Sequence, residues 1–407
     1  MSFSKLTIKD VPVEHKTVLV RADYNVPLNA KGEISDDLRI RASLPTLQFL
    51  LDHKSTVVII SHLGRPEGRD VSQSLAPVAE HLQGLLGRPV QFVEDCVGDT
   101  VKQAVRNAAP GSVLLLENLR YYKEEEANDA EFARKIADAT GARYLVQDGF
   151  GVVHRAHAST DAITQYIPGV AGLLLEKELR IITAAMEDPA RPLVAVLGGA
   201  KVSDKITVIE RFVAVADKII IGGAMANTFL AYHGYNVGAS KVEADQTEVL
   251  NRIYAAARDK VGDGVNDFII LPVDLAVATD ITPGAERRVV SVSDLGQDDI
   301  ALDIGDQSIL RLANEIADAK TVVWNGTLGY AEIPAFAHGS ARLALSLATQ
   351  PQTTSIIGGG DTADFVLKWD GEQGKSFTHV STGGGASLEL MAGKVLPGVA
   401  SLLDAKK

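Results

Sequence analysis

The sequence of 407 residues contains a single cysteine, few aromatic residues and no long hydrophobic run. With Cys96 alone, no disulfide can form within the chain, which is typical of proteins from reducing compartments. We expect Cys96 to be a small buried hydrophobic residue. No apolar run approaches the ~20 residues of a membrane-spanning helix, and the opening segment MSFSKLTIKD lacks the apolar core of a secretory signal. We therefore expect a cytoplasmic protein with no membrane partner.

Two common nucleotide-binding signatures are also missing. The chain has no G-x-x-x-x-G-K-[ST] motif, so it is not a P-loop enzyme. No G-x-G-x-x-G motif opens a helix after a first strand, and this absence argues against a nicotinamide-dependent oxidoreductase.

The charge balance is acidic, with a net charge of −12 at pH 7. A protein of this charge is a poor partner for nucleic acid, because phosphates attract basic surfaces. Most of the acidic excess follows residue 170, so the earlier part of the chain is the better place for an anionic ligand. Hydrophobic residues make up 46% of the sequence, which is typical of globular proteins. The length suits two domains.

Short runs rich in Val, Ile and Leu recur along the chain, and turns and helical patterns follow them. The runs cover residues 17–27, 56–66, 112–120, 143–151, 192–201, 218–225, 267–274, 321–329, 354–361 and 379–387. Helical patterns cover residues 75–86, 127–140, 203–215, 246–260 and 307–319. Such apolar runs suit strands that are buried on both faces. The alternation predicts an α/β fold with two Rossmann-like, doubly wound parallel-sheet lobes.

One amphipathic segment divides the chain. Residues 171–187 place apolar side chains at helical spacing, with Pro168 before the segment and Pro189 and Pro192 after it. We interpret this segment as a helix that connects an N-terminal lobe, residues 1–170, to a C-terminal lobe, residues 188–390.

Basic and other polar side chains follow the predicted strands of the first lobe, where ligands of open α/β sheets bind. These positions, with Arg39 on the connection after the first strand, are Asp23, Asn25, His62, Arg65, Arg120, His154, Arg155 and His157. Any one arginine alone reads as a surface residue, but the repeated placement predicts a basic pocket. The arginine fork grips carboxylate and phosphate oxygens. Asp23 and Asn25 either accept from a ligand hydroxyl or serve as turn residues before Pro27.

Glycine pairs or triplets stand between strand and helix four times in the second lobe. They are Gly198-Gly199, Gly222-Gly223, Gly358-Gly359-Gly360 and Gly383-Gly384-Gly385. Glycine lets the backbone approach a ligand closely, and a helix N-terminus then points N–H groups at an anion. Lys201 and Lys205 lie four residues apart, which predicts one helix face from which both reach phosphates. Asp361 is either a Mg²⁺ ligand or a plain N-cap.

Eight motifs in this sequence resemble those of phosphoglycerate kinases, and they occur in the family's order over nearly the whole chain. They are RADYNVP (21–27), HLGRP (62–66), ENLRYYKEEE (117–126), FGVVHRAHAST (150–160), GGAKVSDK (198–205), WNGTLGYAE (324–332), GGGDT (358–362) and STGGGASLEL (381–390). The resemblance implies two lobes facing across a cleft, with residues from about 391 to 407 packing back on the first lobe.

The resemblance also implies roles for particular residues. The phosphoglycerate site carries over to Asp23, Asn25, Arg39, His62, Leu63, Gly64, Arg65, Arg120 and Arg155. The nucleotide site carries over to Lys205, Gly222, Gly223, Asn325, Glu332, Gly358, Gly359, Gly360, Asp361 and Thr362. The catalytic set is Arg39, Lys201, Gly360 and Gly384. In this pattern Lys201 attends the transferring phosphoryl group, Glu332 meets the ribose, and Asp361 binds the Mg²⁺ that accompanies ATP or ADP.

The sequence departs from the family pattern at several positions without losing a charged or metal-binding residue. Thr327 replaces a proline, and Tyr330-Ala331 replaces Val-Phe, within the nucleotide motif. Val152-Val153 replaces a pair of small residues, and Ala22 and Tyr24 replace Val and Phe.

The implied reaction is 1,3-bisphosphoglycerate + ADP ⇌ 3-phosphoglycerate + ATP. The carboxylate that accepts or loses the phosphoryl group is already ionised, so positioning and charge stabilisation suffice. The two lobes must close, with hinges at the ends of the connecting helix and around residues 387–389. We expect a monomer. A non-catalytic anion-binding protein, the remaining alternative, would not need Lys201, Lys205 and Asp361.

Overall fold

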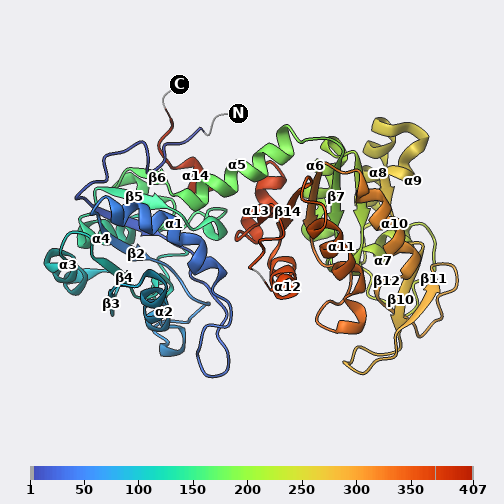
Figure 1. Cartoon of the computed structure of the whole chain (residues 1–407), viewed down its shortest axis with the longest axis horizontal. Helices are drawn as coiled ribbons and strands as arrows, with labels where there is room; N and C mark the ends of the chain where they lie inside the picture. Colours follow the sequence, from blue (N-terminus) through green and yellow to red (C-terminus); the bar gives the residue numbers. More distant parts are fainter. Residues whose placement is uncertain (1–3, 372, 406–407) are drawn as a thin grey trace. The chain divides into compact units, whose positions relative to one another are not determined.

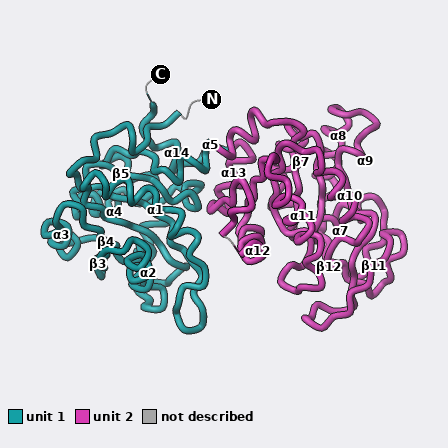
Figure 2. The backbone as a smooth tube through the Cα atoms, viewed as in Figure 1, with its two compact units in different colours: residues 1–180, 394–407 teal, residues 181–393 magenta. Residues whose placement is uncertain are grey.

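The computed structural model describes residues 4–371 and 373–405, which form two compact units. Unit 1 takes the chain up to Arg180 and again from Lys394 onward, and unit 2 is Ile181–Gly393 (Figure 2). Each unit holds a six-stranded parallel sheet with helices packed on it (Figure 1). The predicted fold class, α/β with two parallel-sheet lobes, is confirmed.

The sheet of unit 1 has the strand order β3-β4-β2-β1-β5-β6. Its strands are β1 (Thr17–Arg21), β2 (Thr56–Ile60), β3 (Val90–Val93), β4 (Val113–Leu116), β5 (Tyr144–Gln147) and β6 (Gly169–Ala171). Its helices are α1 (Leu38–Asp52), α2 (Ala76–Leu86), α3 (Gly98–Asn107), α4 (Ala130–Thr140) and α14 (Pro397–Ala400). Short 3₁₀ turns are η1 (Val71–Gln73), η2 (Leu119–Tyr121), η3 (Phe150–Val152) and η4 (Ala162–Gln165).

Alternate residues of these strands enter two separate cores, because successive side chains of a strand point to opposite faces. Val18 and Val20 pack in the core with α1 and α2, whereas Leu19 packs in the core with α3 and α4. Cys96 belongs to the second core and is 1% exposed, which confirms that it is a buried hydrophobic residue. Helices therefore cover both faces of the sheet, and polar loops gather at the carboxyl ends of its strands.

The last part of the chain packs on unit 1. The backbone N–H of Gly398 donates to the carbonyl oxygen of Val153 at 2.9 Å, and Lys5 forms an ion pair with Asp404 at 2.8 Å. Val152 and Val153, which depart from the family pattern, are both buried, and a Cβ added to Gly398 would lie 3.0 Å from the Cα of Val153. The two valines thus pack beneath the returning segment.

Unit 2 holds the sheet β15-β14-β13-β7-β8-β9 and a second, antiparallel sheet β11-β10-β12. The parallel strands are β7 (Leu193–Leu197), β8 (Lys218–Ile221), β9 (Ile269–Ile270), β13 (Thr321–Asn325), β14 (Thr354–Gly358) and β15 (His379–Val380). The antiparallel strands are β10 (Asp274–Ala278), β11 (Arg288–Ser291) and β12 (Ile300–Ile304). The helices are α6 (Ile206–Val215), α7 (Gly223–Tyr232), α8 (Thr247–Val261), α9 (Val265–Phe268), α10 (Asp306–Ala317), α11 (His338–Ala348), α12 (Gly360–Asp370) and α13 (Gly385–Met391), with 3₁₀ turns η5 (Ser203–Lys205), η6 (Gly262–Gly264) and η7 (Pro334–Phe336).

Two element boundaries differ from the sequence prediction. The run 267–274 is not one strand: β9 ends at Ile270 and β10 begins at Asp274, with Pro272 between them, where no N–H is available for a ladder. The connecting helix is α5 (Leu173–Glu187), which begins two residues later than predicted because residues 169–171 pair with β5 as β6. Among the described residues, no helix has both the length and the apolar character needed to cross a membrane.

Candidate active site

The loops after β1, β2 and β4 are joined by hydrogen bonds at one edge of the sheet in unit 1. Asn25 accepts at Oδ1 from the backbone N–H of Gly64 at 2.8 Å, and Nη1 of Arg120 donates to the carbonyl oxygen of Gly64 at 2.8 Å. Gly64 has a φ of +63°, which favours glycine. Leu63 beside it is buried, and its carbonyl oxygen accepts from Asn118 Nδ2 at 2.7 Å. The predicted substrate residues on these loops therefore lie together.

Arg39, in the first turn of α1, reaches the loop after β1. Its Nη1 lies 3.2 Å from Oδ2 of Asp23 and donates to the carbonyl oxygen of Asn25 at 2.9 Å. Asp23 also accepts at Oδ1 from the N–H of Asn25 at 3.2 Å, which is the turn contact proposed as the alternative role. Asp23 thus shapes the turn and holds Arg39 as well.

Two buried histidines lie within this group of arginines, and their pKa values reflect the positive charge around them. Burial and the positive charges of Arg21, Arg120 and Arg39 lower the pKa of His62 well below its usual value. Burial, with Arg21 and Arg120 next, lowers the pKa of His157 to about 4. Both imidazoles are neutral at pH 7, and the field around them favours an anionic ligand.

The remaining predicted basic residues of unit 1 differ in exposure. Arg155 is partly buried and donates from Nε to Nε2 of His154 at 3.2 Å. Arg65, on the loop after β2, is exposed. Arg120 is 9% exposed, and its Nη2 pairs with Glu126 at 2.9 Å. Arg155 and Arg120 are near enough for each to depress the pKa of His157.

A buried ion pair that the sequence did not predict lies among these residues. Arg21, the last residue of β1, is 1% exposed and lies 3.7 Å from the carboxylate of Glu125, which is fully buried. Both residues belong to the family motifs RADYNVP and ENLRYYKEEE, which is the one feature of the sequence that could have drawn attention to them. An arginine within an apolar strand and a glutamate within a run of three give no indication that the two side chains are in contact.

In unit 2, the glycine-rich loops after β7, β8 and β13 hold one another through backbone hydrogen bonds. The N–H of Gly199 donates to the carbonyl oxygen of Thr327 at 3.0 Å, and the N–H of Gly223 donates to that of Leu328 at 2.9 Å. Gly223 has a φ of +64°, and an added Cβ would lie 2.6 Å from the backbone nitrogen of Gly199. A Cβ on Gly222 would lie 2.5 Å from Leu328 Cδ2. These glycines are required by close packing, and Thr327 takes part through its backbone.

Lys205 and Lys201 do not share a helix face, so that prediction is wrong. Residues 203–205 form the turn η5 and α6 begins at Ile206, which leaves Lys201 before the first helical residue and exposed. Lys205 is 9% exposed and donates from Nζ to the carbonyl oxygens of Gly198 at 2.6 Å and Asn325 at 2.9 Å. Burial lowers the pKa of Lys205 to about 8, although Asp361 acts in the opposite direction.

The carboxyl ends of β13 and β14 carry the remaining nucleotide residues. Asn325 is 1% exposed, and its Nδ2 is a buried donor with no partner among the described residues. An added Cβ on Gly358 or Gly359 would lie 3.2 or 3.3 Å from that nitrogen. Thr362 is buried and accepts from the N–H of Gly326 at 2.7 Å. An orphaned buried donor beside a glycine turn fits a site that a ligand oxygen completes.

Asp361 is the second residue of α12, and the N-cap is Gly359. The alternative that Asp361 is a plain N-cap is therefore wrong, since the cap position holds no side chain. Asp361 is exposed, and Gly360 precedes it as the first residue of the helix. Gly384, with a φ of +48°, occupies the N-cap of α13. Glu332 is exposed in the turn that follows β13.

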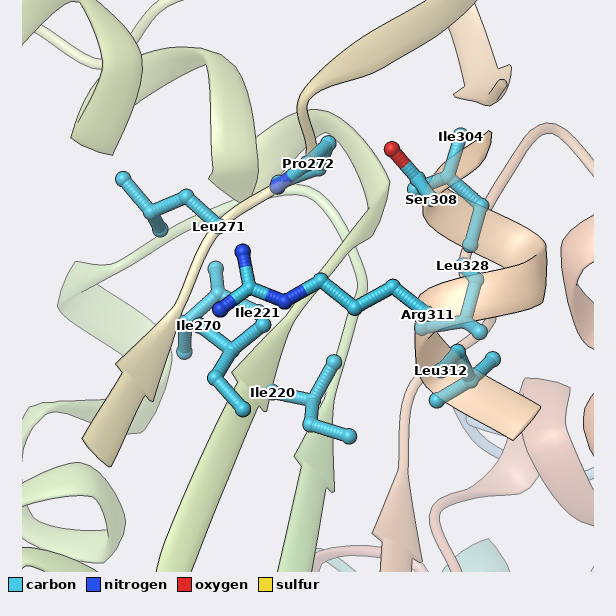
Figure 3. A pocket seen from close by; sticks show the side chains of 10 residues that line it. All are labelled: Ile220, Ile221, Ile270, Leu271, Pro272, Ile304, Ser308, Arg311, Leu312 and Leu328. Carbon is cyan, nitrogen blue, oxygen red and sulfur yellow. The ribbon is translucent and has the colours of Figure 1, made fainter. Parts of the chain in front are cut away.

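An apolar hollow lies between β8, β9 and the first turns of α10 (Figure 3). It is lined by Ile220, Ile221, Ile270, Leu271, Pro272, Ile304, Ser308, Arg311, Leu312 and Leu328. The guanidinium of Arg311 extends over it toward Leu271 and Ile270, and Nε of Arg311 lies 3.6 Å from Glu315. None of the predicted site residues lines the hollow, but two lining residues adjoin the glycine turns: Ile221 directly precedes Gly222, and the carbonyl oxygen of Leu328 accepts from the N–H of Gly223.

Arginines near the strand ends of one unit and glycine turns around a buried lysine in the other are the features expected of a two-unit α/β phosphotransferase. The family model described as phosphoglycerate kinase matches residues 8–394, and this chain belongs to that family. It is 47% identical to the phosphoglycerate kinase of Dictyoglomus turgidum over 98% of both chains. It is 48% identical to that of Moorella thermoacetica over 98% of this chain and 100% of the relative. The structure of phosphoglycerate kinase from Coxiella burnetii superposes with a TM-score of 0.84 at 36% identity, covering 98% of each chain.

Proposed function

We propose that this chain catalyses the reversible transfer of a phosphoryl group from 1,3-bisphosphoglycerate to ADP, giving 3-phosphoglycerate and ATP in glycolysis. The family match supports the reaction. The single structural observation that carries the proposal is the cluster of guanidiniums around His62 and His157 in unit 1, which adds to the effect of burial in lowering the pKa of both histidines. 3-Phosphoglycerate brings both a carboxylate and a phosphate, and this field suits such a multiply charged anion.

On the substrate side, the proposal assigns unit 1 to the phosphoglycerate. Arg120 and Arg155 with exposed Arg65 bind its phosphate and carboxylate oxygens, and Asp23 with Asn25 accepts from its hydroxyl. The hydrogen bond from Gly64 to Asn25 supports this assignment, since it fixes the amide before any ligand arrives. Preorganised polar groups of this kind lower the cost of ordering a ligand.

On the nucleotide side, the proposal assigns the glycine turns of unit 2 to ADP or ATP. Gly222 and Gly223 form the turn after β8 that the nucleotide contacts, and Glu332 binds the ribose. Asn325, Thr362 and the N–H groups of Gly358–Gly360 line the phosphates. Lys205 supplies charge from below. Because Lys205 Nζ donates to the backbone carbonyl of Asn325, its charge lies close to the side-chain Nδ2 of Asn325, which has no partner among the described residues.

The residues of unit 2 fit a Mg²⁺ ion that arrives with the nucleotide. Among the described residues, no group of three or more His, Cys, Asp or Glu side chains could hold a metal by itself. Asp361 therefore offers a single carboxylate, and Mg²⁺ commonly takes one or two protein carboxylates with substrate phosphates and water. The bound ion would neutralise phosphate charge during transfer.

The protein's role in the proposed phosphoryl transfer is to position the two substrates and to stabilise the charge of the transferring group. The acceptor carboxylate is ionised at pH 7, so no general base is required. Arg39, Lys201 and the N–H groups of residues 358–360 and 383–385 stabilise the transferring oxygens, with Gly360 and Gly384 keeping the backbone accessible. Direct in-line transfer needs the reacting atoms within roughly 3–3.5 Å, so hinge closure must bring the two ligands together.

A coupled assay tests the proposal. Purified protein with Mg²⁺, ATP and 3-phosphoglycerate is expected to form ADP and 1,3-bisphosphoglycerate, read through a dehydrogenase that consumes the product. A protein that binds 3-phosphoglycerate without turnover would instead be an anion-binding protein. We further propose that the enzyme acts as a cytoplasmic monomer, which sedimentation and cell fractionation would check.

A further inference from the structure

The buried Arg21–Glu125 pair has a defined set of contacts that reach the proposed substrate loops. Arg21 donates from Nε to Oγ of Ser159 at 2.7 Å and from Nη1 to the carbonyl oxygen of Ala22 at 2.5 Å. Its Nη2 lies 3.4 Å from Nδ1 of His62. One buried guanidinium thus contacts the segments that carry Ser159 and His62 as well as the carbonyl oxygen of the next residue, Ala22.

Glu125 and Ser159 hold this guanidinium in place. Glu125 accepts from the backbone N–H of Ser159 at 3.0 Å and from its hydroxyl at 2.5 Å. Since the Ser159 hydroxyl donates to Glu125, its oxygen is left to accept from Arg21. Hydrogen bonds join Arg21 to Ser159 and Ser159 to Glu125, and the ion pair between Arg21 and Glu125 at 3.7 Å completes the ring of three side chains. A ring of this kind, fully removed from water, fixes its members more firmly than an exposed pair.

The contact between Arg21 and His62 determines which nitrogen of the His62 imidazole carries the proton. An arginine has five N–H donors and no acceptor. Nδ1 of His62 can therefore only accept, and the neutral imidazole must bear its proton on Nε2. Among the described residues, His62 makes no hydrogen bond through Nε2, so this N–H remains as a donor for a ligand oxygen.

We propose that Arg21 is a positioning residue for phosphoglycerate binding, which selects the Nε2–H tautomer of His62 and, with Glu125 and Ser159, ties the substrate loops together. The inference rests on the proposed phosphoglycerate site. With the opposite tautomer, Nε2 would be an acceptor facing an anion, and the site would repel the oxygen it has to bind. Arg21 itself acts through His62 and does not need to touch the substrate.

Nitrogen NMR of protein labelled at histidine tests the tautomer directly, since long-range ¹⁵N–¹H correlations separate the two neutral forms. The His62 signal is assigned by its loss in His62→Gln. In the ligand-free parent at pH 7 we expect Nε2 protonated and Nδ1 bare. A proton on Nδ1, or on both nitrogens, would overturn the inference. This NMR measurement needs no variant of Arg21 or Glu125 and does not depend on enzymatic activity.

A double variant tests the effect on binding. Arg21→Met with Glu125→Met removes both charges, because removing one partner would leave the other buried and unpaired. We expect the 3-phosphoglycerate dissociation constant to rise on the order of tenfold or more, with mixed His62 tautomers, a higher His62 pKa and unchanged Mg-ADP affinity. The matched control is Arg134→Met with Glu131→Met, an exposed pair on α4.

The outcomes separate the two proposals. A parent without turnover of ATP and 3-phosphoglycerate rejects the proposed function, whatever the tautomer. An active parent together with a folded double variant that binds 3-phosphoglycerate as tightly as the parent rejects the positioning role. If the double variant does not fold, the tautomer of the parent decides alone.

Discussion

The guanidinium of Arg39 lies 3.2 Å from the Asp23 carboxylate, with no ligand required to bring them together. Arg39 also donates to the carbonyl oxygen of Asn25, so two contacts hold its side chain in the first turn of α1 against the loop after β1. An arginine held in this way is preorganised to stabilise charge that develops near it.

We predict that Arg39→Ala lowers the turnover number on the order of 10²-fold or more, which is the usual effect of losing a charge-stabilising donor. Steady-state kinetics in both directions measure this effect. Arg41→Ala on the same helix, where Arg41 pairs with Asp37, is the matched control and should leave turnover unchanged. A near-normal turnover number with only a raised Michaelis constant would instead show that Arg39 binds ground state and transition state equally.

Asp361→Ala should weaken Mg-ADP binding and activity while leaving 3-phosphoglycerate binding intact. In the proposed complex the Asp361 carboxylate is the protein's ligand to the ion, whereas the residues proposed to bind phosphoglycerate belong to unit 1. Calorimetry with each ligand separately provides the measurement. Asp364→Ala, which removes an exposed carboxylate of α12 that pairs with Lys368, is the control. Equal Mg-ADP affinity in Asp361→Ala and parent would contradict the assignment.

Asp148 should make unit 1 less stable as the pH rises. Burial raises the pKa of Asp148 to about 7, and its Oδ2 has no hydrogen-bond partner among the described residues. The folded state therefore holds a proton that the unfolded state loses near the usual pKa of 3.8, so stability is highest below that value and declines up to about pH 7.

Asp148→Asn should remove this decline, because an amide does not titrate and its Oδ1 still accepts from Thr46 and Leu174. The stability of the variant relative to the parent should rise between about pH 4 and pH 7, by up to about 4 kcal/mol. Urea unfolding followed by circular dichroism across this range measures the difference. Asp138→Asn, at an exposed position of α4, should show no such trend. A parallel pH dependence in Asp148→Asn and parent would show that Asp148 is ionised throughout.

Closure should require both ligands. Each ligand contacts chiefly its own unit in the proposed complex, so one ligand alone has little preference for the closed state. Small-angle scattering of free, singly liganded and doubly liganded protein, with a non-reacting nucleotide analogue, should show a smaller radius of gyration only in the ternary complex. A radius that is the same in all four states would argue against closure on binding. The moving points are expected at the ends of α5 and around residues 387–389.

Much of this protein was determined by sequence alone, because its patterns are local. Apolar runs such as TVLVR and TVVII are removed from water only when both faces of the strand are buried, and in the structure they form β1 and β2 of a parallel sheet. The side chains that follow the strands had to gather at one edge, because parallel strands end there. The eight ordered motifs were likewise sufficient to indicate the family that the comparisons show.

Only the tertiary structure decided how the candidate residues are arranged. The four-residue spacing of Lys201 and Lys205 predicted a shared helix face, yet the helix begins later and Lys205 turns inward onto the carbonyls of Gly198 and Asn325. The antiparallel sheet β11-β10-β12 was missed because β11 is largely exposed and so forms no distinctive apolar run. Arg21 and Glu125 lie 104 positions apart in the sequence numbering. Periodicity reports which face of an element is buried, but it carries no information about which distant charge that burial will bring into contact.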